Sequence, residues 1–180
     1  MYYARIPKER VAVLIGKGGE VKREIEERSG ARLEIDSESG DVTIDERNII
    51  EPVLTLKVQD VVRAIGRGFA PENAFRLFQD DVYFELIDIK DYAGKSPQNR
   101  KRLRARVIGT KGKTRKLIQE LTGASVCVYG NTVALIGDVV ELEVARTAVD
   151  MLLRGSEHST VYRFLERKRR YIKASSLEMV

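Results

Sequence analysis

Residues 15–19 read Ile-Gly-Lys-Gly-Gly and residues 108–112 read Ile-Gly-Thr-Lys-Gly, so one glycine pattern occurs twice at an offset of 93 positions. At the same offset, Ser29-Gly30-Ala31 matches Thr122-Gly123-Ala124. Further along, the offset shrinks to 87, where the Arg-Gly pair at residue 67 is matched by the pair at residue 154. A shrinking offset means shorter loops in the second copy, so the chain contains two copies of one module.

The same elements are predicted in both copies, in the order strand, helix, helix, strand, strand, helix. In the first copy we expect them at residues 2–7, 9–15, 20–28, 32–36, 42–44 and 52–65. In the second copy we expect them at residues 82–90, 98–108, 113–121, 125–129, 132–136 and 139–153. The first two helices of each copy end at a glycine, which is a common way for a helix to stop.

The predicted fold is therefore α+β, with two tandem βααββα modules, each a three-stranded antiparallel sheet packed against three helices. We expect a first module at residues 1–68, a linker at 69–81, a second module at 82–155, and a basic C-terminal helix or tail at 156–180. Within the tail, the apolar and aromatic side chains are expected to dock the helix rather than to stack on bases: Tyr162, Phe164 and Leu165.

The helix–Gly-x-x-Gly–helix unit has a definite chemistry. Two glycines around two variable residues let the backbone turn sharply and approach another backbone without a Cβ clash. The following helix points its free N–H groups and positive dipole end at the loop, which favours an anion. Lys17 and Lys111 add a full charge to the two loops, so the unit predicts a clamp for a sugar-phosphate backbone. The apolar ends of the preceding helices are expected to form a floor for unstacked bases: Val11, Leu14, Ile15, Val107 and Ile108.

Charge separates the two halves of the chain. Residues 1–90 contain 14 Lys and Arg against 18 Asp and Glu, whereas residues 91–180 contain 18 against 9. The stretch from Tyr92 to Gln119 holds ten basic residues and no acidic one. Such an asymmetry predicts that the second half meets a polyanion. Between Arg5 and Arg28, in contrast, five acidic residues are mixed with the basic ones and lower the local potential for phosphate.

The composition argues against several other classes of protein. The single cysteine, Cys127, excludes an intramolecular disulfide and is expected to be a small core residue. The single histidine, His158, argues against histidine-based metal or triad chemistry. Gly112-Lys113-Thr114 looks like the end of a Walker A loop, but Val107 stands where that loop needs a glycine. No segment is apolar enough to span a membrane, so we expect a cytoplasmic protein. From the scarcity of cysteine and histidine and the missing Walker A glycine, we also expect no metal and no cofactor.

The two Gly-x-x-Gly units, each followed by a helix, Ser-Gly-Ala or Thr-Gly-Ala and a strand, resemble the type I KH domain over about residues 1–155. This resemblance implies binding of single-stranded RNA or DNA, with each loop clamping four nucleotides. The two-module layout, the join and the basic C-terminal helix are similar to the Dim-two/Pno-one family of ribosome assembly factors. That similarity implies binding near the three-prime end of small-subunit rRNA, in pre-rRNA processing and small-subunit maturation. It also implies two protein partners, the endonuclease Nob-one and the alpha subunit of translation initiation factor two.

The favoured hypothesis is thus a non-catalytic RNA-binding assembly factor. The alternatives are another KH protein, exosome-associated or a translational regulator, and a phosphate-handling enzyme. The second module is expected to hold RNA mainly through Gly109, Thr110, Lys111, Gly112, Lys113, Arg115, Lys116, Arg100, Lys101, Arg102, Arg104, Arg106 and Ile108. The first module is expected to add an auxiliary RNA or protein contact through Gly16, Lys17, Gly18, Gly19, Lys22 and Ile15. Arg104 matches an apolar residue in the first copy and is expected to read a base.

Overall fold

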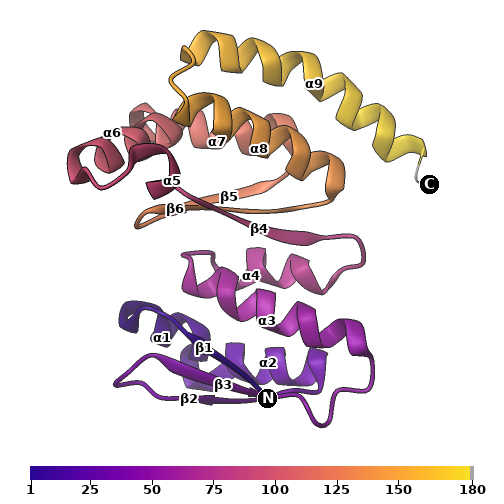
Figure 1. Ribbon diagram of the computed structural model, residues 1–180. Helices are drawn as coiled ribbons and strands as arrows, with labels where there is room; N and C mark the ends of the chain where they lie inside the picture. The colour runs from indigo at the N-terminus through magenta and orange to yellow at the C-terminus, as the bar shows by residue number, and fades with distance from the viewer. Residues whose placement is uncertain (179–180) are drawn as a thin grey trace. The chain divides into compact units, whose positions relative to one another are not determined.

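The computed structural model describes residues 1–178 and divides the chain into two compact units, residues 1–80 and residues 81 onward (Figure 1). Each unit has its own three-stranded antiparallel sheet and its own helices. The prediction of an α+β fold with two repeated modules is therefore confirmed.

The first unit is built around the central strand of its sheet. Its elements are β1 (Tyr2–Arg5), α1 (Lys8–Ile15), the 3-10 turn η1 (Lys17–Gly19), α2 (Glu20–Ser29), β2 (Arg32–Ile35), β3 (Asp41–Asp45), α3 (Pro52–Gly66), α4 (Pro71–Ala74) and the 3-10 turn η2 (Phe75–Phe78). The strands are ordered β1-β3-β2, and Ile44 on β3 pairs with Tyr2 on one side and Leu33 on the other. The alternate side chains of β3 therefore meet the helices in one core.

Residues 69–80, which belong to the predicted linker at 69–81, pack on the first unit. Phe69, Ala74 and Leu77 are buried. Lys57 of α3 donates hydrogen bonds from Nζ to the carbonyl of Leu77, at 3.2 Å, and to the carbonyl of Gln79. In the structure this stretch is thus folded against α3 by buried apolar side chains and by a lysine that binds its carbonyl groups.

The second unit repeats the arrangement, with a longer helix before its Gly-x-x-Gly loop and an added C-terminal helix. Its elements are β4 (Tyr83–Asp88), α5 (Lys90–Ala93), α6 (Pro97–Ile108), the 3-10 turn η3 (Thr110–Gly112), α7 (Lys113–Thr122), β5 (Ser125–Tyr129), β6 (Thr132–Gly137), α8 (Val139–Leu153) and α9 (His158–Glu178). The strand order β4-β6-β5 copies that of the first sheet. The short helix α5 was not predicted; the carboxylate of Asp88 accepts the Lys90 N–H at 2.9 Å, where the strand stops and α5 begins.

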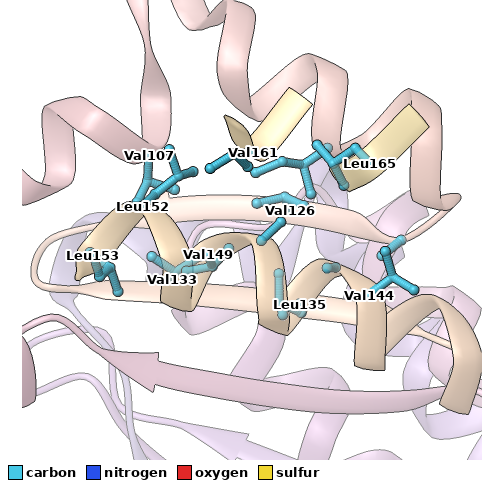
Figure 2. Packing of buried hydrophobic residues seen from close by; sticks show 14 of the residues in the cluster. Val107, Val126, Val133, Leu135, Val144, Val149, Leu152, Leu153, Val161 and Leu165 are labelled. Carbon is cyan, nitrogen blue, oxygen red and sulfur yellow. The ribbon is translucent and has the colours of Figure 1, made fainter. Parts of the chain in front are cut away.

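The core of the second unit lies between its sheet and its helices, and Figure 2 shows part of it. Leu135 from β6, Val149 and Leu152 from α8 and Val107 from α6 are completely buried. The C-terminal helix α9 closes this core over α7 and α8, because Leu165 is also completely buried there. The expected docking of the tail helix by its apolar side chains is therefore seen for Leu165, and Phe164 packs against the same cluster.

Cys127 is half-buried, so its expected place in the core is wrong. Side chains alternate between the two faces of a strand, and its neighbours Val126 and Val128 face the core. Cys127 therefore points to the opposite face of the sheet. Because Val126, Cys127 and Val128 are all apolar, the sequence does not show which of them face the core.

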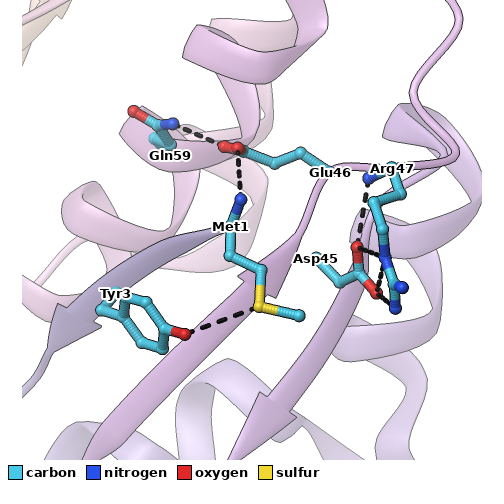
Figure 3. Close-up of polar contacts among 6 residues, drawn as sticks. All are labelled: Met1, Tyr3, Asp45, Glu46, Arg47 and Gln59. Carbon is cyan, nitrogen blue, oxygen red and sulfur yellow. Dashed lines mark hydrogen bonds and ion pairs between the residues drawn. The ribbon is translucent and has the colours of Figure 1, made fainter.

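The N-terminus of the chain is held by polar contacts at the end of the first sheet (Figure 3). The amino group of Met1 pairs with Glu46 at 3.5 Å, and the other carboxylate oxygen of Glu46 accepts a hydrogen bond from Gln59 of α3 at 2.6 Å. Beside them, hydrogen bonds from Arg47 lower the pKa of Asp45 to about 2. The contacts of Glu46 thus tie the start of the chain and the end of β3 to α3.

Among residues 1–178, no helix has both the length and the apolar character that a membrane span requires.

Candidate nucleic-acid interface

The two Gly-x-x-Gly loops have the same backbone. The first glycine of each, Gly16 or Gly109, has φ 75° and ψ 173°, a region that is nearly restricted to glycine. A Cβ on Gly16 would lie 2.8 Å from the Val21 nitrogen, and one on Gly109 would lie 2.8 Å from the Thr114 nitrogen. These glycines thus let the end of one helix approach the first turn of the next, as the sequence predicted.

The second variable residue of each loop has a left-handed conformation. Gly18 has φ 59° in the first loop, and Lys111 occupies the matching position with φ 53°. A left-handed conformation costs a residue with a Cβ roughly 1 kcal/mol or more. The Lys111 side chain is exposed at the tip of the second loop. The second loop accepts this strain where the first avoids it with a glycine, and the result is an exposed cation at its tip.

The helices that follow the loops begin without a side-chain cap. Gly19 and Gly112 are the N-cap residues of α2 and α7, and neither helix has a side chain bound to its first N–H groups. Both N-termini can therefore donate to an anion. However, α2 begins with Glu20, whereas α7 begins with Lys113 and has no acidic residue in its first turn. Only the second loop combines free N–H groups with a cation at the helix start.

The floor predicted for bases is mostly wrong. Val11, Leu14 and Val107 are between 0% and 4% exposed, so they belong to the cores of their units. Only Ile15 and Ile108, next to the loops, are half-buried and accessible. The helical spacing of the buried residues explains the error, because residues three or four apart share the inward face of a helix.

The structure gives the basic residues of α6 different surroundings. Lys101 and Arg102 are exposed. Arg100 donates from Nε to the carbonyl of Gly94 at 3.0 Å, and Arg104 donates to the carbonyl of Gly130, in the β5–β6 turn, at 3.3 Å. Arg104 therefore reaches across to the sheet side of the helix, while Lys101 and Arg102 are free to meet phosphate.

Arg106 has a structural partner. Its guanidinium donates to the carbonyl of Leu152, at 2.9 Å, and to that of Ser156, at the end of α8. In the first unit, Arg10 does the same, donating to the carbonyls of Ile65 at 2.9 Å and Phe69 at 2.8 Å. The acceptor residues correspond between the two copies, because Ile65 matches Leu152 and Phe69 matches Ser156 at the offset of 87. The two arginines do not correspond, because the offset in this part of the repeat is 93. The sequence therefore gave no signal for this shared role.

The remaining predicted residues lie on the loops and the helices that follow them. Thr110, Lys113 and Lys116 are exposed in the second unit, and Lys17 and Gly18 in the first. Arg115 and Lys22 are half-buried on α7 and α2. Arg102, Arg106, Gly109, Thr110 and Lys113 all line one pocket of the second unit. In the described part of the chain, no cluster of three or more His, Cys, Asp or Glu side chains is placed to hold a metal ion.

The sequence matches two family models. Residues 3–51 match the KH domain, and residues 83–170 match the eukaryotic-type KH domain, type I. A KH domain-containing protein of Methanocaldococcus jannaschii is 51% identical over 178 residues, which cover 97% of this chain and 77% of that protein. The chain belongs to the family of tandem KH-domain proteins. Its two loops are therefore the GXXG loops of an RNA-binding fold.

Three solved structures resemble this KH protein over nearly its whole length. Dim2p from Pyrococcus horikoshii OT3 is 49% identical with a TM-score of 0.84, covering 92% of this chain and 98% of its own. A chain in the a/eIF2alpha-aDim2p-rRNA complex from the same organism is 48% identical with a TM-score of 0.87, covering 94% and 93%. A protein of unknown function from Aeropyrum pernix is 40% identical with a TM-score of 0.90, covering 99% and 95%.

Proposed function

We propose that this KH protein is a ribosome assembly factor that binds single-stranded rRNA near the three-prime end of the small-subunit rRNA. The observation that carries the proposal is the 48% identity to a chain in a complex that contains rRNA, together with an intact GXXG loop at Gly109 to Gly112. Its role is in pre-rRNA processing and small-subunit maturation.

The second unit is the main RNA grip in this proposal. Its GXXG loop has a lysine at the tip and a lysine at the start of α7, in a stretch from Tyr92 to Gln119 without any acid. The phosphate backbone supplies most of the affinity of such an interface, because each neutralised phosphate releases counterions. The first unit, with Glu20 at the start of α2, makes an auxiliary contact with RNA or protein.

The protein acts on RNA without chemistry of its own in this proposal. It holds its strand for partners that carry the chemistry or the next assembly step. The alpha subunit of translation initiation factor two is one proposed partner, since the related complex contains a/eIF2alpha. The endonuclease Nob-one is a second, which rests on the family resemblance alone.

The test has a test-tube part and a cellular part. The purified protein should bind single-stranded RNA from the three-prime end of small-subunit rRNA at least tenfold more tightly than an internal segment of equal length, and leave both uncleaved. Crosslinking in cells, followed by sequencing of the bound RNA, should recover small-subunit precursor RNA. Recovery of messenger RNA instead would contradict the assembly role and favour a translational regulator.

A metal-dependent cleavage activity that follows the protein through purification and is abolished by a point substitution in it would contradict the non-catalytic role. The same protein preparation should therefore be incubated with the precursor RNA in the presence and absence of Mg²⁺, and the products resolved on a gel.

A further inference from the structure

A pocket of about 490 Å³ lies behind the second GXXG loop, between α6, α7 and the start of α9. Its volume falls in the range of roughly 300–1,000 Å³ that is typical of ligand pockets. It is lined by Arg102, Ala105, Arg106, Gly109, Thr110, Lys113, Thr114, His158 and Tyr162.

This pocket lies on one flank of α6, and the β5–β6 turn lies on the other. Arg104 marks the sheet flank, because it donates to Gly130 in the β5–β6 turn. Arg106 marks the opposite flank, because it donates to Leu152 at the end of α8. Gly109 and Thr110 of the GXXG loop line the pocket as well. The second GXXG loop therefore forms one edge of the pocket.

The lining of the pocket combines an aromatic ring with cations and hydrogen-bonding groups. The Tyr162 hydroxyl and the Thr114 hydroxyl share a hydrogen bond of 2.8 Å, and Lys113 Nζ lies 5.8 Å from the centre of the Tyr162 ring. The His158 ring bonds to the Arg106 carbonyl at 2.9 Å and lies edge-on to Tyr162. The lining residues include no Asp or Glu. This chemistry suits a base and its phosphate, since bases stack on aromatic rings and cations bind phosphate.

The first unit has a pocket of about 450 Å³ that corresponds in part, but its lining mixes acidic and basic side chains and does not include the GXXG loop. Phe75 stands at the position of Tyr162 at the offset of 87, and Glu20 at the position of Lys113 at the offset of 93. Glu24 and Glu72 line this pocket too, and the guanidinium of Arg28 lies 5.1 Å from the centre of the Phe75 ring. Of these two pockets, the one in the second unit has cationic side chains without any carboxylate and reaches the GXXG loop, whereas the one in the first unit does neither.

We propose that the pocket behind the second GXXG loop binds one further nucleotide of the same RNA strand, next to those on the loop. The base packs against Tyr162, and Arg102 and Lys113 bind the phosphate. This inference rests on the proposed RNA grip of the second unit. It extends the binding site from the loop to α9, a helix that lies outside the βααββα module.

The experiment measures affinity as a function of strand length. Single-stranded RNAs of four to eight nucleotides, lengthened one nucleotide at a time at either end, are titrated against the protein by fluorescence anisotropy. The wild type should show a step in affinity when the strand reaches the pocket. Tyr162→Leu should remove about fivefold or more of that step, the low end for loss of a stacked base, and leave the shortest strand unaffected. Tyr162→Phe, which keeps the ring, should retain most of the step.

Two matched controls make the result specific. Phe75→Leu changes the corresponding ring of the first unit and should not alter the step. Arg102→Glu should reduce the step, whereas Arg163→Glu, an exposed residue on α9 outside the pocket lining, should reduce it much less. If Tyr162→Leu fails to fold, Arg102→Glu decides, together with photocrosslinking of the wild type to strands that carry 4-thiouridine at each position.

The outcomes separate this inference from the proposed function. If the wild type binds none of the RNAs, the proposed function itself fails. If the wild type binds but Tyr162→Leu and Arg102→Glu retain the full step, and no crosslink falls on the segment around Tyr162, the pocket does not hold RNA. A crosslink to Tyr162 from a single position of the strand, lost when the strand is shortened past it, supports the inference.

Discussion

The first and second GXXG loops have matching backbone angles, while the side chains around them differ in charge. Gly16 and Gly109 share φ 75° and ψ 173°, but α2 starts with Glu20 and α7 with Lys113. An acid in the first turn stabilises a helix through its dipole, whereas a lysine there destabilises it. Lys113 thus lowers the stability of α7 at the helix end where a phosphate would bind. The loop geometry is therefore common to both copies, and the charge of the surrounding side chains distinguishes them.

The largest expected effect comes from placing carboxylates in the loops. Thr110→Asp with Lys111→Asp should weaken RNA binding roughly a hundredfold, about 3 kcal/mol, because two negative charges then face phosphate. Lys17→Asp with Gly18→Asp should weaken it less than tenfold, since Glu20 already lies beside that loop. Fluorescence anisotropy measures both, and circular dichroism checks the fold. Equal losses would contradict the unequal roles of the two units.

The next effect concerns the shared backbone, and here the two units should behave alike. Gly109→Ala and Gly16→Ala should each destabilise their own unit by about 2–3 kcal/mol, because a Cβ is strained at this φ and ψ and meets the next helix. Gly18→Ala, with nothing within 4 Å of its Cβ, should cost only the strain of its left-handed backbone, about 1 kcal/mol. Amide hydrogen exchange during urea titration reports each unit separately. A large effect in one unit alone would show that the loops are not structurally equivalent.

Arg10 and Arg106 should also act alike, although they stand at different positions of the repeat. Replacing either with Ala leaves two carbonyl groups at the end of α3 or α8 without their charged donor. We expect a loss of about 1.5–2 kcal/mol in the unit concerned, in the range for hydrogen bonds to charged groups. The salt dependence of RNA binding should stay unchanged in Arg106→Ala. A salt slope reduced by about 0.7 would instead mark Arg106 as a phosphate contact.

Exchanging the residues that start α2 and α7 tests the trade between helix stability and RNA binding. Lys113→Glu should stabilise the second unit by about 0.5 kcal/mol through the helix dipole and weaken RNA binding about tenfold. Glu20→Lys should do the reverse in the first unit, with a smaller gain in RNA binding. The same hydrogen exchange and anisotropy measurements apply. If Lys113→Glu weakens neither, the lysine has no part in the interface.

The smallest expected effect on affinity separates a base reader from the phosphate contacts. Lys101→Ala should reduce the slope of log affinity against log salt by up to about 0.7, equally for all sequences. Arg104→Ala should change the preferred sequence instead, since Arg104 lies on the flank of α6 that faces the β5–β6 turn and not on the flank of the pocket. Selection from a randomised RNA pool with the wild type and both variants measures this. An unchanged preference in Arg104→Ala would place it among the phosphate contacts.

Much of this protein follows from the sequence alone. The repeat, the order of the elements, the two loops and the charge difference between the halves are all local or periodic features. The helix after each loop begins at the predicted residue, Glu20 or Lys113, because the last glycine of the loop marks the start of the helix. The structure repeats a side-chain contact at matching positions of the two copies. Glu26 accepts the N–H of Leu33 at 2.8 Å, and Gln119 accepts the N–H of Val126 at 2.9 Å.

Other features were decided only by the tertiary structure. The sequence could not separate core from surface at Val11, Leu14 and Val107, because an apolar residue near a loop suits either a base or a core. It could not show that Arg10 and Arg106 share a role, because each arginine finds its acceptors 46 to 59 residues away along the chain. The pocket behind the second loop has the same origin, since its lining comes from α6, α7 and α9, which only the tertiary fold brings together. Contacts between distant segments depend on packing in three dimensions, which no local pattern encodes.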